Sequence, residues 1–307
     1  MQQPQLQSVP VSGPVARDGG TRRMAYWDWS SDLGAACRHA VICVHGLSRQ
    51  GRDFDVLARS LTAQSRVLAV DVAGRGHSDW LADPAGYQVG TYAADLAALL
   101  MQVRSEMPDA AIDWVGTSMG GLIGMAIAAQ PALAPRRLVL NDVGPVIQWE
   151  ALQRIGTYLG KNPSFDSEQH ATDYLASISA GFGPHTPEQW LALSRPMLRE
   201  RGGRWWLHYD PALAVPFKAL NSGTDEAAAR QTVRDGEAAL WGLYDAISAT
   251  TLLLRGADSD LLTRETAALM ATRGPRARCV EFAGVGHAPT LVADDQVATV
   301  RDFLWSA

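Results

Sequence analysis

Ser118 lies in the sequence GTSMGG at residues 116–121, with glycines two residues before it and two residues after it. An apolar run at 111–115 precedes this stretch, and a helix-like run at 122–129 follows it. Strand, tight turn and helix in this order are typical of a serine held in a strained backbone conformation, where flanking glycines remove clashes. The helix N-terminus would favour negative charge that develops near the serine. We therefore predict that Ser118 is a nucleophile, although a glycine-rich turn also suits phosphate binding.

A serine hydroxyl attacks efficiently only when a base lies within hydrogen-bonding reach and a carboxylate orients that base. Of the seven histidines, His287 is the best placed, in the loop GVGHAP at 284–289. This loop follows a predicted strand at 278–282 and precedes a predicted helix at 294–305, at the same end of the sheet as Ser118. We expect His287 to be the base, because the acid and the histidine should both come after the serine in the chain.

The carboxylate should follow a strand that lies between the serine and the histidine. The segment RGADSDLL at 255–262 offers Asp258 and Asp260, and both follow a predicted strand. Asp142 follows an earlier predicted strand and is a third candidate, although its neighbours also fit a turn or a cap. Spacing alone does not separate Asp258 from Asp260.

Acyl transfer also needs backbone amides that donate to the developing oxyanion. We expect one from the N–H of Met119, directly after the serine, and one from the N–H of Leu47, in the loop after the apolar run at 40–44. His45 and Gly46 would then shape this loop without taking part in the reaction.

The elements that must position these residues alternate between strand and helix. Continuous apolar runs at 40–44, 67–71, 111–115 and 137–142 indicate strands that are buried on both faces, and the pattern resumes with a strand at 251–255. Helix-like segments separate these runs. The alternation predicts an α/β fold with a mostly parallel central sheet flanked by helices.

The strand-like runs vanish from about residue 146 to residue 246, where helical segments with aromatic residues appear. This change predicts a core domain formed by 21–145 and 247–307, with a helical cap at 146–246 over the carboxyl ends of the strands. Residues 1–20 are rich in Gln, Pro, Gly and Ser and are expected to form a flexible tail.

Aromatic residues of the cap are candidates for substrate binding. The segment WWLHY at 205–209 places Trp205, Trp206 and His208 together, and we expect them to contact substrate. Packing of the cap onto the core is an equally good explanation for any single tryptophan.

Composition limits the classes of partner. The chain has 307 residues and a net charge of −5, and its only lysines are Lys161 and Lys218, so no basic patch for nucleic acid is expected. No apolar run approaches the length of a membrane span, and the N-terminus lacks the apolar segment of a secretory signal. Three cysteines cannot all pair within the chain, which favours a reducing compartment. We expect a cytoplasmic monomer or homodimer that acts on a small molecule and needs neither metal nor cofactor.

The chain resembles the α/β-hydrolase fold superfamily, in its esterase-like branch with a helical cap. The resemblance runs from about Tyr26 to the C-terminus and rests on HGL at 45–47, DVAGRGHS at 71–78, GTSMGG at 116–121 and GH at 286–287. The family usually places its acid three residues after the glycine of the RG turn, where this chain has Ser259. Some members carry R-G-x-x-S-D with the aspartate of the S-D pair as acid, and this similarity favours Asp260 over Asp258.

The resemblance implies a serine hydrolase that cleaves carboxylic esters or lactones through an acyl-enzyme. Hydrolysis of carbon–carbon bonds is an alternative, although relatives with that activity usually have tryptophan after the histidine, where this chain has Ala288. A cofactor-free perhydrolase or haloperoxidase uses the same triad and stays open. A non-catalytic ligand-binding protein of the same fold is a further alternative, but no triad member is missing. A dinucleotide site is not expected, because the glycines lack the G-x-G-x-x-G spacing.

Overall fold

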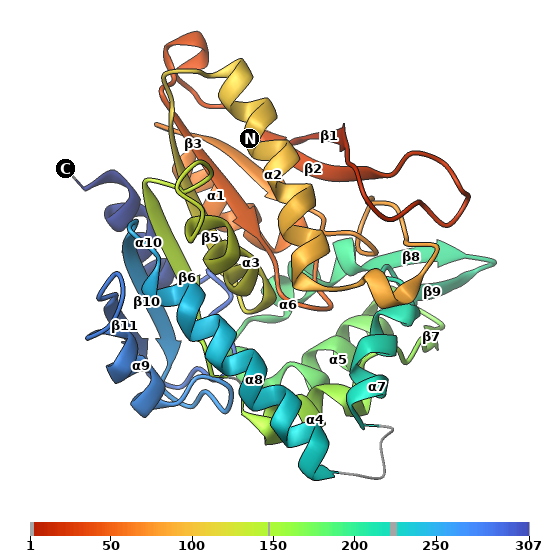
Figure 1. Ribbon diagram of the computed structural model, residues 1–307. Helices are drawn as coiled ribbons and strands as arrows, with labels where there is room; N and C mark the ends of the chain where they lie inside the picture. The colour runs from red at the N-terminus through yellow and green to blue at the C-terminus, as the bar shows by residue number, and fades with distance from the viewer. Residues whose placement is uncertain (1–2, 147, 222–225, 307) are drawn as a thin grey trace.

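A computed structural model describes residues 3–146, 148–221 and 226–306, and its centre is an eight-stranded sheet (Figure 1). The strand order is β1-β2-β4-β3-β5-β6-β10-β11. All neighbours from β4 to β11 are parallel, whereas β1 and β2 are antiparallel to their neighbours. The strands are β1 (Gln5–Pro10), β2 (Arg23–Trp29), β3 (His39–Val44), β4 (Arg66–Val70), β5 (Ala111–Thr117), β6 (Arg137–Asn141), β10 (Thr250–Gly256) and β11 (Arg278–Phe282). The predicted mostly parallel sheet is confirmed.

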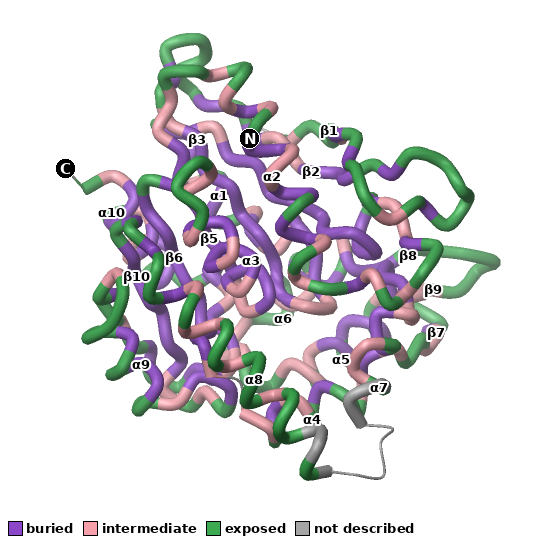
Figure 2. Tube along the Cα trace, in the orientation of Figure 1, coloured by how far each residue is buried: buried purple, intermediate pink, exposed green. Residues whose placement is uncertain are grey.

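Helices cover both faces of this sheet, and its central strands β3, β4, β5, β6 and β10 are largely buried, whereas the edge strands β1 and β11 are mostly exposed (Figure 2). One hydrophobic cluster combines the sheet with α2 (Val89–Glu106), α3 (Met119–Ala128) and α9 (Arg264–Met270). A second cluster on the other face includes α1 (Asp55–Leu61) and α10 (Asp294–Trp305). Strand β3 is buried on both faces, since Ala40, Ile42 and Val44 belong to the first cluster and Val41 and Cys43 to the second. Burial on both faces explains why its sequence is almost continuously apolar.

The N-terminal segment is not the flexible tail that its composition suggested. Strand β1 pairs with β2 in register from Gln5↔Asp28 to Pro10↔Arg23. Val9 and Val11 are buried in the core, and Ala16 forms an isolated bridge with Leu81. Paired backbone groups and buried apolar side chains hold this segment on the sheet, so the expectation for residues 1–20 is wrong over the described part.

The chain leaves the sheet after β6 and returns to it at β10. The intervening segment carries α4 (Trp149–Tyr158), β7 (Ser164–Phe165), α5 (Glu168–Ile178), α6 (Pro187–Ser194), β8 (Leu198–Arg201), β9 (Arg204–Leu207), α7 (Ala214–Asn221) and α8 (Glu226–Asp245). Figure 1 shows α4, α5 and α7 gathered at one end of the sheet, with α8 running back towards α3. This segment is called the cap below, and its division from the core at residues 146 and 246 stays a prediction.

The sequence suggested a purely helical cap, but the cap also contains β-strands. A small antiparallel sheet has the order β7-β9-β8, and β8 and β9 form a hairpin through Gly202 and Gly203. Both glycines have positive φ, of 62° and 71°, which suits a tight hairpin turn. Strands of four residues and two residues are too short for an alternating pattern to reveal them.

Candidate active site

Ser118 stands at the junction between β5 and α3 and has the strained backbone that the motif predicts. Its φ is 51° and its ψ is −116°, a conformation that costs free energy in a residue with a side chain. A Cβ atom at Gly116 would lie 2.3 Å from the carbonyl oxygen of Gly120, and one at Gly120 would lie 1.9 Å from that of Val44. Only glycine fits at these two positions, so the turn holds the serine at the N-terminus of α3.

His287 lies against the serine, as predicted. Its Nε2 atom is 2.9 Å from Ser118 Oγ, and its side chain is 14% exposed. The loop that carries it follows β11, at the carboxyl end of the sheet.

The carboxylate beside His287 belongs to Asp142. Its Oδ2 atom is 2.7 Å from His287 Nδ1 and also accepts a hydrogen bond of 2.6 Å from the Ser259 hydroxyl. Its Oδ1 atom accepts a hydrogen bond of 2.8 Å from the backbone N–H of Gly256. Asp142 directly follows β6, is fully buried and has a positive φ of 55°. Four groups thus form a chain from the Ser259 hydroxyl through Asp142 and His287 to Ser118.

The expectation that Asp260 orients the histidine is wrong. Asp260 Oδ2 accepts from Arg154 Nε at 2.7 Å, and its side chain is 50% exposed. Asp258 is exposed as well, and the structure gives it no hydrogen bond to His287. The β10 loop instead presents Ser259, whose hydroxyl donates to Asp142 on the neighbouring strand. The third aspartate considered from the sequence therefore occupies the position beside the imidazole.

The loop after β3 brings Leu47 near the serine and is shaped by His45. The His45 Nδ1–H donates to the Gly46 carbonyl at 2.6 Å, and Nε2 accepts from the Val72 N–H at 3.0 Å. Because the backbone N–H can only donate, Nδ1 carries the single proton of a neutral ring. Complete burial lowers the pKa of His45 to about 3, and the positive charges of Arg75 and Arg49 act in the same direction. The hydrogen bond to the Gly46 carbonyl opposes this shift only in part.

The two predicted amide donors are placed as follows. The Gly46 carbonyl belongs to the same peptide group as the Leu47 N–H, so His45 fixes the orientation of that N–H. Met119 is the first residue of α3, and its N–H has no carbonyl four residues earlier within the helix. Leu47 lines the same cavity as Ser118, and Met119 directly follows Ser118 in the chain.

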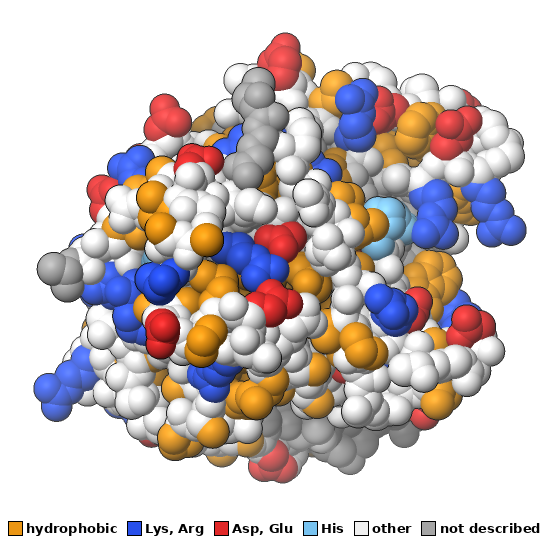
Figure 3. Space-filling view, turned by 90° about the horizontal axis from the view of Figure 1, so that it is seen from above, with side chains coloured by type: hydrophobic (Ala, Val, Ile, Leu, Met, Phe, Trp, Pro, Cys, Tyr) orange, Lys and Arg blue, Asp and Glu red, His pale blue; other side chains and the backbone are white. Residues whose placement is uncertain are grey.

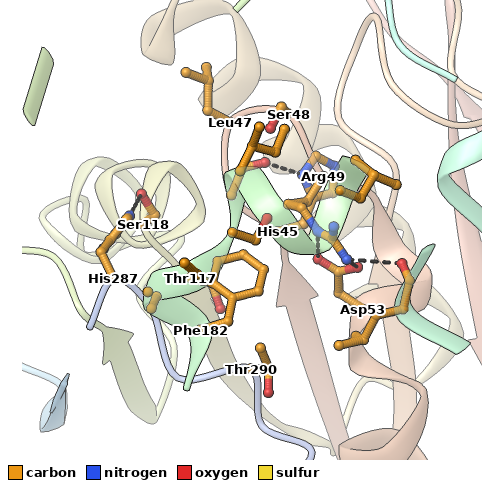
Figure 4. A pocket seen from close by; sticks show the side chains of 18 of the residues that line it. His45, Leu47, Ser48, Arg49, Asp53, Thr117, Ser118, Phe182, His287 and Thr290 are labelled. Atoms are coloured by element: carbon orange, nitrogen blue, oxygen red, sulfur yellow. Dashed lines mark hydrogen bonds and ion pairs between the residues drawn. The ribbon is translucent and has the colours of Figure 1, made fainter. Parts of the chain in front are cut away.

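A cavity of about 510 Å³ opens over Ser118 and His287 (Figure 4). From the core side, Arg49 lines it and binds the Asp53 carboxylate with Nε at 2.7 Å and Nη2 at 2.6 Å. The same Nη2 atom donates to the carbonyl of Leu193 in the cap. The cap supplies a mostly apolar wall formed by Ile155, Tyr158, Tyr174, Leu175, Ile178, Phe182, Leu193, Met197, Leu207 and Tyr209.

The expected substrate contacts of the cap do not line this cavity. Trp206 and His208 border a separate hollow, and Trp205 packs against the hydrophobic core. Leu207 and Tyr209 line the cavity in their place. The segment 205–209 therefore reaches the cavity through residues other than Trp205, Trp206 and His208, because the sequence alone does not reveal its strand register.

A second serine, histidine and aspartate array lies at the opposite end of the sheet. Ser65 Oγ is 2.8 Å from His39 Nδ1, and His39 Nε2 is 2.6 Å from Asp113 Oδ2. Ser65 is fully buried and also accepts from Trp305 Nε1. No strained turn presents this serine, and burial denies it a substrate, so this array is structural. Residue types and hydrogen bonds alone therefore do not define the active site.

Figure 3 shows basic and acidic side chains interspersed over one face of the molecule. Within the described part of the chain, no group of three or more His, Cys, Asp or Glu residues is placed to hold a metal ion. Of the helices that the structure describes, none has the length and apolar character required to cross a bilayer.

The sequence matches the alpha/beta hydrolase family over residues 41–300. It is 47% identical over 308 residues to a 3-hydroxybutyrate-oligomer hydrolase of Cupriavidus necator, an alignment that covers 99% of each chain. An esterase of Mycobacterium tuberculosis is 28% identical over 251 residues, covering 79% of this chain and 74% of the esterase. The crystal structure of an alpha/beta hydrolase from Novosphingobium aromaticivorans superposes with a TM-score of 0.81 at 34% identity and covers 99% of both chains. The chain therefore belongs to the alpha/beta hydrolase family, as an esterase-like hydrolase.

Proposed function

We propose that this protein is a serine hydrolase that cleaves short carboxylic esters through an acyl-enzyme, with Ser118, His287 and Asp142 as its catalytic triad. The observation that carries the proposal is the continuous hydrogen-bond chain from Asp142 through His287 to a serine on a strained turn. That arrangement supplies a nucleophile, a base and a group that orients the base.

In the first half of the reaction, Ser118 Oγ attacks the ester carbonyl while its proton moves to His287 Nε2. Asp142 accepts from Nδ1–H and stabilises the imidazolium that forms. The N–H groups of Leu47 and Met119 donate to the carbonyl oxygen as it becomes negative. When the tetrahedral intermediate collapses, His287 returns the proton to the alkoxide, so the alcohol leaves and the acyl group stays on Ser118.

In the second half, His287 takes a proton from a water molecule, and the resulting hydroxide adds to the acyl carbonyl. The intermediate then collapses with return of that proton to Ser118 Oγ, and the carboxylic acid leaves. Every proton that His287 removes is returned, so the triad ends in its starting state. Metal and organic cofactors have no step in this scheme.

For the substrate, we propose small oligomers of 3-hydroxybutyrate and related hydroxyacyl esters. The support is the 47% identity, over nearly the whole of both chains, to a hydrolase named for those oligomers. The cavity of about 510 Å³ lies within the usual range for small-molecule sites. Its apolar cap wall suits methyl groups, and its polar side chains suit ester oxygens.

The experiment is hydrolysis of the 3-hydroxybutyrate dimer and trimer, followed by chromatography of the released monomer. The wild type is expected to release monomer, and Ser118→Ala is expected to release none above the uncatalysed rate. Ser65→Ala is the matched control, because it removes the serine of the structural array and should keep the activity. Equal activity in wild type and Ser118→Ala would refute the proposal.

The same assay separates the proposed function from its alternatives. Activity on simple p-nitrophenyl esters but not on the oligomers would keep the esterase and reject the substrate. Inactivity on every ester, together with turnover of a dienoate ring-cleavage product, would favour carbon–carbon hydrolysis. Inactivity on all of them would favour a ligand-binding protein.

A further inference from the structure

Arg75 is a fully buried arginine that touches both residues of the proposed oxyanion hole. Its Nε donates to the Leu47 carbonyl at 2.8 Å, and its Nη2 lies 3.4 Å from Met119 Sδ. Nη1 donates to the carbonyl of Ala73 at 2.6 Å and lies 2.9 Å from the hydroxyl of Tyr92. The side chain thus contacts the carbonyl of Leu47 and the side chain of Met119, is fully buried, and does not line the substrate cavity.

The charge of Arg75 is not neutralised by any carboxylate that the structure describes. Its partners are two carbonyls, a phenol and a thioether, with the rings of Tyr92 and Tyr87 centred 5.0 and 5.9 Å from its guanidinium carbon. Buried charges are usually paired, because an isolated one loses its hydration. The buried Arg22 follows that rule and binds Asp95. Arg75 departs from it at the place where negative charge would develop during the reaction.

The hydrogen bonds of Arg75 complete a clamp on Leu47. His45 holds the peptide group that precedes the Leu47 Cα, through the Gly46 carbonyl, and Arg75 holds the one that follows, through the Leu47 carbonyl. These two hydrogen bonds restrict rotation of both peptide groups and therefore of the Leu47 N–H. Arg75 also contacts the side chain of Met119, so one guanidinium connects the two donors.

We propose that Arg75 is a positioning residue of the oxyanion hole, which fixes Leu47 and Met119 and adds positive potential near their amides. This inference rests on the proposed function, since it presumes an oxyanion at this place. A fixed charge in a buried, water-excluded region acts over several ångströms with little screening. Its effect is largest when the substrate oxygen carries a full negative charge, so Arg75 lowers the free energy of the tetrahedral state more than that of bound substrate.

The test compares Arg75→Met, Arg75→Gln and Arg75→Lys with wild type on a p-nitrophenyl ester. Removal of a single oxyanion donor typically costs 10²–10³ in kcat, so we expect Arg75→Met to lower kcat about 100-fold, with KM within about threefold. Arg75→Lys keeps the charge and should retain at least about ten times the kcat of Arg75→Gln, which keeps a hydrogen-bonding group without the charge. A glutamine variant as active as the lysine variant would overturn the electrostatic part.

A second readout is inhibition by a trifluoromethyl ketone, which adds to the serine and carries the oxyanion. Its inhibition constant should rise by the same factor by which kcat/KM falls across the three variants. Arg22→Met is the matched control, because it removes another buried arginine; it should lower the melting temperature and leave kcat unchanged. Unchanged kcat in Arg75→Met, or a kcat loss without weaker inhibition, would overturn the proposal.

Variants at Arg75 and at Ser118 test the inference about Arg75 and the proposed function separately. If Ser118→Ala is inactive while Arg75→Met matches wild type, only the inference about Arg75 fails. If Ser118→Ala keeps full activity, the proposed function itself fails. If Arg75→Met does not fold, the ratio between the lysine and glutamine variants decides.

Discussion

At the scale of single residues, the carboxylate that contacts His287 is Asp142 and not Asp260, which the sequence had favoured as the acid. Asp142 follows β6, while the usual place for the acid after β10 holds Ser259. Ser259 donates to Asp142, so the residue at the usual place supports the acid from the neighbouring strand. Asp260 serves instead in an ion pair with Arg154, between core and cap.

This assignment predicts opposite results for two conservative substitutions. Asp142→Asn should lower kcat by about 10³–10⁴, because an amide at this position favours the wrong histidine tautomer. Asp260→Asn should stay within about threefold of wild type, because an exposed ion pair contributes little. Steady-state hydrolysis of a p-nitrophenyl ester measures both. A larger loss in Asp260→Asn than in Asp142→Asn would restore the original expectation.

Ser118 and His287 were predictable because each lies in a motif whose local backbone fixes its place. The acid was not, because any of the loops after β6 and β10 reaches the same end of the sheet, and only the tertiary structure shows which carboxylate meets the imidazole. Signals in favour of Asp142 existed, since it is the first residue after a buried strand and Ser259 replaces the usual acid. Arg75 offered no signal, because its contacts with the Leu47 carbonyl, the Tyr92 hydroxyl and Met119 Sδ join residues that are distant in sequence.

At the scale of elements, the amino end of the parallel sheet is tied together by Asp113 on β5. Its carboxylate accepts from Arg136 Nε at 3.0 Å and from Arg136 Nη2 at 2.6 Å, and it lies 2.6 Å from His39 Nε2. Burial alone would raise the pKa of Asp113, but the hydrogen bonds from His39 and Arg136 hold it below its ordinary value. A carboxyl with a depressed pKa stabilises the fold above its unfolded-state pKa and loses that contribution as the pH falls through the folded-state value.

Asp113→Asn should therefore destabilise the protein by about 2–4 kcal/mol at pH 7, since it removes a buried carboxylate that is hydrogen-bonded to His39 and to the partly exposed Arg136. The difference from wild type should narrow below about pH 4, where the wild-type carboxyl is also protonated. Urea unfolding at several pH values measures this. The kcat at pH 7 should remain at the wild-type level, because Asp113 lies at the far end of the sheet. A difference that is constant with pH would contradict the account.

The edge strand β1 gives a further prediction at this scale. Removal of residues 1–12 deletes the partner of β2 and exposes the cluster that Val9 and Val11 cover. Burial of two such side chains contributes about 1.5–3 kcal/mol each, so we expect a loss of about 2–5 kcal/mol after the entropy of ordering is subtracted. Thermal unfolding compares this variant with one lacking only residues 1–4. Equal melting temperatures of the two variants would show that the N-terminal segment does not stabilise the fold, as expected of a tail.

At the scale of the whole molecule, residues of both core and cap line the cavity, so under the proposed function both would contribute to substrate choice. The alternating runs of strand and helix made the core predictable from the sequence, whereas the irregular elements and the small sheet of the cap could not be predicted. The cap's register decides which of its aromatic residues face the cavity. Tyr209 and Leu207 do, while Trp206 faces a separate hollow.

This arrangement predicts that Leu207→Trp reduces the cavity and discriminates by substrate length. Activity on the 3-hydroxybutyrate trimer should fall on the order of tenfold relative to activity on p-nitrophenyl acetate, because the added volume excludes the longer acyl chain. Trp206→Ala is the matched control in the adjacent position and should leave that ratio unchanged. The ratio of kcat/KM values for the two substrates measures the effect. If Trp206→Ala changed this ratio and Leu207→Trp did not, the face of β9 that carries Trp206 would line the cavity, contrary to the structure.

The most direct measurement is the reaction of the protein with a fluorophosphonate, followed by peptide mass spectrometry. We expect one adduct per chain, located on Ser118, at a rate that falls sharply in His287→Ala and hardly in His39→Ala. An adduct on another residue, or no adduct in a protein that still hydrolyses esters, would contradict the assignment of Ser118 as the nucleophile.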